Sequence, residues 1–124
     1  AIAIGLIFAS CNAAPEFRNV TPLQADSLIR ADSAKKTFHL IDIRTPEEFA
    51  TGRIRGARIM DFYAPDFQTR LSKLPRDAKI LLYCRSGNRS GQALSTMRTM
   101  GFTDAGHVAG GINAWRSQGL PVEP

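Results

Sequence analysis

The sequence predicts an α/β fold, a three-layer sandwich with a five-stranded, mostly parallel sheet and helices on both faces. Strand-like and helix-like segments alternate about five times along the chain, as they do in parallel βα units. Two of the strand-like segments, residues 38–43 and 79–83, are almost continuously apolar, as strands buried on both faces are. The length of 124 residues fits one domain.

Five strands are indicated by short apolar runs. They are expected over residues 17–20, 38–43, 57–60, 79–83 and 105–108. The carboxyl ends of parallel strands meet at one edge of a sheet, and ligands bind there. Cys84 directly follows the fourth strand, so we expect its side chain at that edge.

The helices are marked by caps and by apolar residues on one side. Two begin at Thr-Pro pairs, Thr21-Pro22 and Thr45-Pro46, in which Thr is the N-cap and Pro takes the first helical position. Glu48 lies three residues after Thr45, which is the spacing of a capping box. The remaining helices are expected over residues 65–74 and 92–100 and in a last turn around position 115.

Residues 1–15 are expected to form a segment of their own before a domain at 16–124. Positions 1–10 are almost wholly apolar; they are too few to span a bilayer as a helix but have the length of a signal-peptide core. Phe8-Ala9-Ser10-Cys11 resembles a bacterial lipobox, in which the Cys is lipidated. We therefore expect export to the cell envelope or periplasm and membrane anchoring through a lipidated Cys11. An ordinary export signal and a cytoplasmic protein with an apolar tail are the alternatives.

Composition and charge exclude several function classes. The hydrophobic fraction of 44% and charged fraction of 22% are typical of a globular protein. The formal net charge is +5, but no Lys/Arg run or basic-aromatic interleaving is present, so nucleic-acid binding is not expected. Two cysteines, Cys11 and Cys84, are too few for a disulfide framework, and we do not expect them to pair. His39 and His107 have no partners at metal-ligand spacing, so no metal site is expected.

The segment Cys84-Arg-Ser-Gly-Asn-Arg-Ser has the composition of an anion-binding loop. It lies between a strand and a helix, so unpaired N–H groups and the positive end of the helix dipole can face the sulfur. Its two arginines add positive charge, and its small residues let the backbone form an anion-binding nest. These features lower the pKa of a thiol and favour the thiolate. A buried core cysteine is the usual alternative. The residues expected to bind an anion are Arg85, Ser86, Gly87, Asn88, Arg89 and Ser90.

Four segments in this order resemble the rhodanese family of sulfurtransferase domains. They are Leu40 to Arg44 with Glu47-Glu48-Phe49, then Gly52 to Ala57, then Cys84 to Ser90, then Gly110 to Trp115 with Gly119 to Val122. Arg53 and Arg55 depart from the family's Gly-His-Ile-Pro-Gly-Ala segment, and their role is left open. Four residues separate Cys84 from Arg89, whereas the related phosphatases have a longer loop, so phosphatase or arsenate chemistry is disfavoured.

The resemblance implies a sulfur transfer in which Cys84 is the nucleophile. Cys84 would take sulfane sulfur from thiosulfate or a similar small anionic donor and pass it, as a persulfide, to a thiol or cyanide. Arg85 and Arg89 would hold the sulfonate end of the donor. Neither a metal nor an organic cofactor is implied, and we expect a monomer. The alternative, from another class, is a persulfide carrier or protein-docking module with little thiosulfate turnover.

The other expected roles are structural. Asp42 and Arg44 are expected to support the loop from a neighbouring strand end, with Arg44 paired to Glu48. Trp115 is expected in the core. His107 is expected on a strand surface, although a dyad with the cysteine is not excluded. Arginines near one end of the sheet would also attract a small dianion; they are Arg44, Arg53, Arg55, Arg58, Arg85 and Arg89.

Overall fold

The structure, a computed structural model, describes residues 14–124. The predicted lipobox-like segment and the lipidation of Cys11 lie outside the described residues. Within 14–124, five strands and five helices alternate strictly along the chain. None of these helices has the length and hydropathy of a membrane span.

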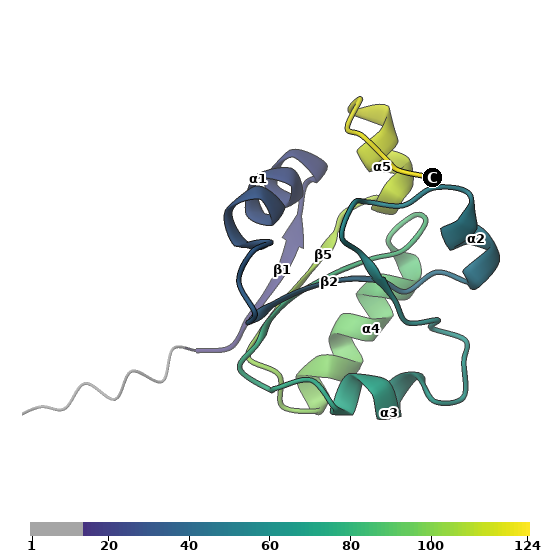
Figure 1. The fold of residues 1–124 in the computed structure, drawn as a ribbon. Coiled ribbons are helices and arrows are strands. Elements are labelled where there is room, and N and C mark those ends of the chain that lie inside the picture. The colour runs from purple at the N-terminus through teal and green to yellow at the C-terminus, as the bar shows by residue number, and fades with distance from the viewer. Residues whose placement is uncertain (1–13) are drawn as a thin grey trace, which may run out of the picture.

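The five strands form one sheet in the order β1-β5-β4-β2-β3, and every pairing between them is parallel (Figure 1). The strands are β1 (Glu16–Val20), β2 (Phe38–Asp42), β3 (Arg58–Ile59), β4 (Lys79–Tyr83) and β5 (Asp104–Val108). The predicted α/β sandwich is confirmed. Because β4 has neighbours on both sides, the residue that follows it emerges near the middle of the sheet's carboxyl edge.

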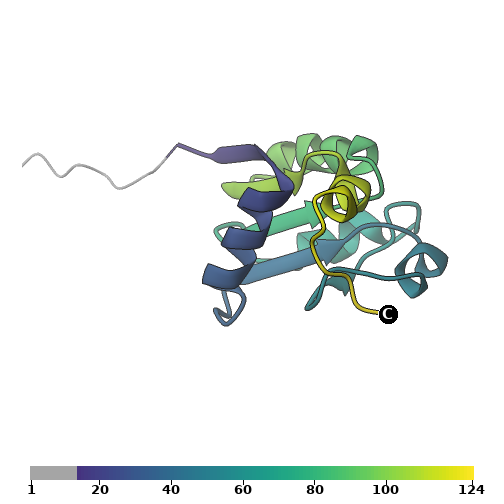
Figure 2. The same cartoon turned by 90° about the horizontal axis from the view of Figure 1, so that it is seen from above.

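Helices cover both faces of the sheet (Figures 1 and 2). On one face lie α1 (Pro22–Asp32) and α5 (Gly111–Ser117), and on the other lie α3 (Phe67–Ser72) and α4 (Asn88–Thr99). The short α2 (Pro46–Ala50) lies beyond the carboxyl end of β2. Both predicted Thr N-caps form complete capping boxes, Thr21 with Gln24 and Thr45 with Glu48.

Two hydrophobic clusters hold the three layers together. In β4, Ile80 and Leu82 pack under α3 and α4, whereas Leu81 and Tyr83 pack under α1 and α5. This alternation is what a strand buried on both faces requires. Trp115 is 2% exposed and lies in the second cluster, as predicted.

The largest differences from the predicted element boundaries are at β3, α3 and α4. The third strand is reduced to Arg58–Ile59, and α3 begins at Phe67 rather than at residue 65, because tight turns closed by hydrogen bonds to Asp61 and Ala64 precede it. The most consequential difference is at α4, which begins at Asn88 rather than at residue 92. Gly87 has a φ of +99° and turns the chain directly into the helix. The last three residues of the predicted anion-binding loop, positions 88–90, therefore belong to the first turn of α4.

Candidate active site

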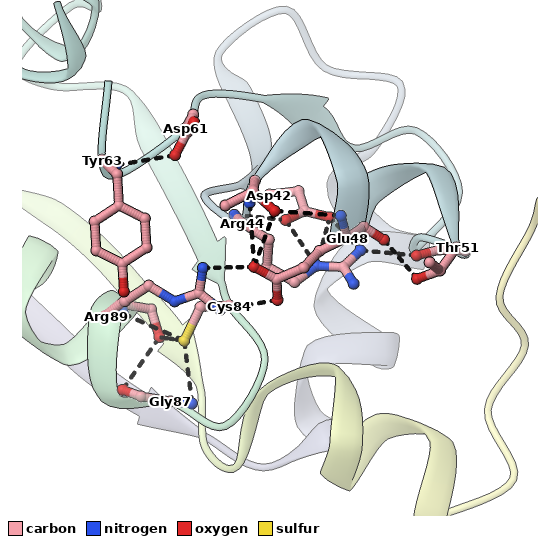
Figure 3. Close-up of polar contacts among 12 residues, drawn as sticks. Asp42, Arg44, Glu48, Thr51, Asp61, Tyr63, Cys84, Gly87 and Arg89 are labelled. Carbon is pink, nitrogen blue, oxygen red and sulfur yellow. Dashed lines mark hydrogen bonds and ion pairs between the residues drawn. The ribbon is translucent and has the colours of Figure 1, made fainter. Parts of the chain in front are cut away.

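The Cys84 sulfur lies inside the loop that joins β4 to α4 (Figure 3). The backbone N–H of Gly87 donates to the sulfur at 3.1 Å, and that of Ser90 donates at 3.4 Å. The Ser90 hydroxyl oxygen is 3.3 Å from the same sulfur. Glycine takes the left-handed backbone conformation of position 87 without steric cost, and this turn brings both amides to one sulfur atom.

These donors decide the charge state of the thiol. Cys84 is 1% exposed, and burial by itself would raise its pKa. Hydrogen bonds from the Ser90 hydroxyl and from the amides of Ser90, Gly87 and Ser86 act in the opposite direction and prevail, so the pKa of Cys84 lies below its ordinary value. The direction agrees with the expectation from the sequence. The loop therefore favours a thiolate.

The base of the loop is fixed by the start of α5. The Ile112 N–H donates to the Cys84 carbonyl at 2.9 Å, and the Asn113 N–H donates to the Arg85 carbonyl at 3.1 Å. Gly111 has a φ of +61°, and a Cβ at this position would lie 2.4 Å from the Arg85 carbonyl oxygen. The sequence had indicated the Gly-Gly pair only as a family motif. In the structure this glycine allows the close approach of α5 to the loop.

Arg89 is engaged by a carboxylate of α2. Its guanidinium nitrogens contact the two Glu48 oxygens at 2.8 and 2.9 Å (Figure 3), and its Cζ lies 5.5 Å from the centre of the Tyr63 ring. The Arg89 hydrogen bond is the chief cause that lowers the pKa of Glu48 to about 2. Sequence reasoning identified Glu48 as a helix cap and as a partner of Arg44, and it missed the ion pair with Arg89. The expected contact of Arg89 with a donor sulfonate stays a prediction.

The predicted pairing of Arg44 with Glu48 is wrong. Arg44 pairs with Asp42, with 2.7 Å between Nη2 and Oδ2, and its Nη2 also donates to the Gly52 carbonyl at 2.7 Å. Asp42 is fully buried, and Arg44 is 2% exposed. A buried carboxylate needs a charged partner, and Arg44, two residues away, is the nearest along the chain. The pair ties the end of β2 to the turn after α2, consistent with the supporting role expected for both residues.

A cavity of about 360 Å³ lies next to the loop, between α2 and the start of α5. Arg85 lines it and is exposed, with no ion pair among the described residues. Arg116, which sequence reasoning did not single out, also lines it. Arg58, expected in the same arginine cluster, instead lines a separate hollow with Arg70 and Lys73. The positive charge available to a ligand here therefore comes chiefly from Arg85 and Arg116.

His107 is not on the strand surface where it was expected. It is 8% exposed, because β5 lies between β1 and β4 and its inner face is covered by α4. Its Nδ1 lies 2.7 Å from the Ser90 hydroxyl oxygen. Burial lowers the pKa of His107, so the imidazole is neutral at about pH 7.

Comparison with known proteins connects this geometry with sulfur transfer. The chain matches the Rhodanese-like domain family over residues 22–118. It is 35% identical over 103 residues to a sulfurtransferase of Allochromatium vinosum, covering 83% of this chain and 94% of that protein. It is 36% identical over 103 residues to the thiosulfate sulfurtransferase GlpE of Pseudomonas putida, covering 82% and 87%. The family and these relatives support a sulfurtransferase activity in general.

Similarity also extends to larger proteins and to a solved structure. The chain is 41% identical over 90 residues to the probable adenylyltransferase/sulfurtransferase MoeZ of Mycobacterium tuberculosis, a match that takes in 73% of this chain but only 23% of that protein. A rhodanese-related protein from Thermoplasma volcanium has a crystal structure that superposes with a TM-score of 0.72 at 25% identity, over 86% of this chain and 97% of that one. The fold is thus that of rhodanese-like domains.

Proposed function

We propose that this chain, which belongs to the rhodanese-like domain family, moves sulfane sulfur from thiosulfate or a similar donor to a thiol or cyanide through a persulfide on Cys84. The observation that carries the proposal is the set of donors around one buried sulfur, namely the Gly87 and Ser90 amides and the Ser90 hydroxyl. Such a cradle stabilises an anionic sulfur, which is the reactive form in both halves of the reaction.

In the first half-reaction the Cys84 thiolate attacks the outer sulfur of thiosulfate. A bond forms between Sγ and that sulfur, the S–S bond of thiosulfate breaks, and sulfite leaves with the electron pair. In the second half-reaction cyanide or a thiolate attacks the terminal persulfide sulfur and releases the Cys84 thiolate. Covalent catalysis of this kind divides one transfer into two easier steps. Charge balances in each step, and no external oxidant or reductant is consumed.

The loop donors have a role in both steps. Negative charge is on Sγ before the attack and on the terminal sulfur after it, and preformed N–H donors stabilise such charge without reorganising. Among the Gly87 amide, the Ser90 amide and the Ser90 hydroxyl, the Gly87 amide lies closest to Sγ, at 3.1 Å. Arg85, exposed on the wall of the neighbouring cavity, supplies a guanidinium for the sulfonate end of the donor. The Arg89 guanidinium is already paired with Glu48, so it binds the sulfonate more weakly than an unpaired arginine would.

The test is the intact mass of the protein before and after incubation with thiosulfate. The chain contains two cysteines, which provides a matched pair of variants, Cys84→Ser and Cys11→Ser. We expect one added sulfur on the wild type and on Cys11→Ser, its removal by cyanide with thiocyanate release, and no adduct on Cys84→Ser.

A persistent adduct on Cys84→Ser would refute the assignment of Cys84. The absence of any adduct on folded, reduced wild type would instead favour the alternative of a persulfide carrier or docking module, which takes its sulfur from a protein donor. Incubation with a persulfidated donor protein then separates these two, because a carrier accepts sulfur on Cys84 from that source and a docking module does not.

A further inference from the structure

The Ser90 hydroxyl has more potential partners than it has protons. Its oxygen lies 2.7 Å from His107 Nδ1, 3.3 Å from Cys84 Sγ and 3.3 Å from the Gly87 carbonyl oxygen. A hydroxyl carries one proton and donates one hydrogen bond at a time. Whether that proton reaches the thiolate therefore depends on what the imidazole does at the shortest of these contacts.

The two neutral tautomers of His107 have opposite consequences. With its proton on Nε2, the imidazole accepts a hydrogen bond from the Ser90 hydroxyl at Nδ1, and the thiolate loses that donor. With its proton on Nδ1, the imidazole donates to the Ser90 oxygen and leaves the hydroxyl proton free for sulfur. Hydrogen bonds to a charged acceptor are stronger than those between neutral groups, so a thiolate at Cys84 favours the second arrangement.

We propose that His107 is a positioning residue for the reactive thiolate: its neutral imidazole donates from Nδ1 to the Ser90 oxygen and thereby directs the Ser90 hydroxyl proton at the Cys84 sulfur. The chain of contacts runs from β5, through the first turn of α4, to the loop. The inference deepens the proposed function, since it concerns the same sulfur.

The packing around His107 maintains this arrangement. His107 pairs in register with Leu82 of β4, two residues before the cysteine, so the imidazole lies beside the strand end. A Cβ on Gly87 or on Gly91 would be in van der Waals contact with the imidazole Cε1, at 3.7 Å, so the ring packs directly against the backbone at the start of α4.

The charged groups near this relay leave the imidazole neutral. Burial is the cause that lowers the His107 pKa, and among residues 14–124 no charged side chain adds to this shift. On the sulfur's side the facing charge is the Arg89 guanidinium from α4, already paired with Glu48 from α2. Proton transfer from sulfur to the imidazole is therefore unfavourable, and the relay acts by donating a hydrogen bond.

The experiment measures the thiol itself, without any sulfur donor. In a Cys11→Ser background, the rate of alkylation by iodoacetamide is followed against pH to give the pKa of Cys84. His107→Leu removes the donor, His107→Gln moves an amide toward the Nε2 position, and His107→Asn keeps an amide N–H close to the Nδ1 position. We expect Leu and Gln to raise the thiol pKa by about 1, which lowers the thiolate fraction about tenfold below that pKa, and Asn to stay near the parent value.

Ser90→Ala provides the decisive comparison. If the imidazole acts through the Ser90 hydroxyl, His107→Gln has no further effect on the thiol pKa once that hydroxyl is gone, because coupled residues are not additive. The relay is refuted if His107→Gln leaves the thiol pKa unchanged in folded protein, or if its effect persists in full in the Ser90→Ala background. Thermal melts establish folding, and the Gln and Asn pair keeps the test decisive if Leu does not fold. A normal relay with no sulfur adduct would refute the proposed function alone.

Discussion

The ion pair between Glu48 and Arg89 is expected to be the main electrostatic link between α2 and the active-site loop. Glu48→Gln removes the charge but retains the shape of the side chain and an amide oxygen that still completes the capping box with Thr45. The variant therefore tests the charge interaction alone. This interaction joins α2 to the first turn of α4, between residues 41 positions apart in the sequence. We expect it to lower the free energy of unfolding at about pH 7 and to loosen the loop.

The magnitude follows from the pKa of Glu48. A fall from 4.5 to about 2 corresponds to about 3 kcal/mol at about 1.4 kcal/mol per pKa unit. The Glu48 side chain is 27% exposed and Gln keeps the contacts to Thr45, so the expected loss is about 1–2 kcal/mol after allowance for solvent screening. A depressed carboxyl pKa stabilises fully above 4.5, and that stabilisation is lost as pH falls toward about 2.

The assay is urea unfolding of wild type, Glu48→Gln and the control Glu47→Gln at a series of pH values from about 7 down to about 3. Glu47 lies in the same first turn of α2 and is exposed, so its substitution reports the helix-dipole contribution alone. The difference between wild type and Glu48→Gln should shrink as pH falls below 4.5. Equal destabilisation by the two substitutions, or a difference that is constant with pH, would refute the reasoning.

Two further predictions concern the loop and its ligand. Gly111→Ala should lower the free energy of unfolding more than Gly56→Ala does. Both positions have positive φ, but only a Cβ at position 111 would lie 2.4 Å from a backbone oxygen. Gly56→Ala should lower it by about 1 kcal/mol from backbone strain alone, and equal melting temperatures of the two variants would contradict this prediction. Arg85→Gln should lower kcat/KM for thiosulfate about tenfold and weaken the salt dependence of kcat/KM. The control is Arg55→Gln, which should change neither, because Arg55 is exposed and lies outside the cavity lining. Equal effects of the two substitutions would refute the role of Arg85.

The fold and the position of the nucleophile were predictable from local patterns. Continuous apolar runs identify β2 and β4 because both faces of these strands are buried. The Thr caps of the two Thr-Pro pairs each bond to a residue only three positions further along the chain. Cys84 could be placed because it directly follows β4 in the sequence. These features depend on the period of side-chain burial and on short-range capping, both of which are visible along the chain.

The partners of the loop could not be predicted in the same way. Glu48 lies 41 residues from Arg89, and His107 lies 17 residues from Ser90. Their contacts arise from the strand order, in which β4 lies between β2 and β5. Single-sequence patterns carry no pairing information of this kind. The partner expected for Arg44 was wrong for a different reason: Asp42 lies only two residues away, but its complete burial, which requires a cation, arises only in the folded sheet.

The negative charge of the Cys84 sulfur is stabilised by backbone amides and a hydroxyl, and not by the two neighbouring arginines. Arg89 faces the thiolate, but its charge is largely neutralised by Glu48. Arg85 is exposed and lines the cavity beyond, where salt screens it. The Gly87 and Ser90 amides and the Ser90 hydroxyl contact Sγ directly, and these groups are dipoles in a site shielded from solvent. Salt should therefore weaken the capture of an anionic donor while leaving the thiol pKa nearly constant, because different groups perform these two tasks.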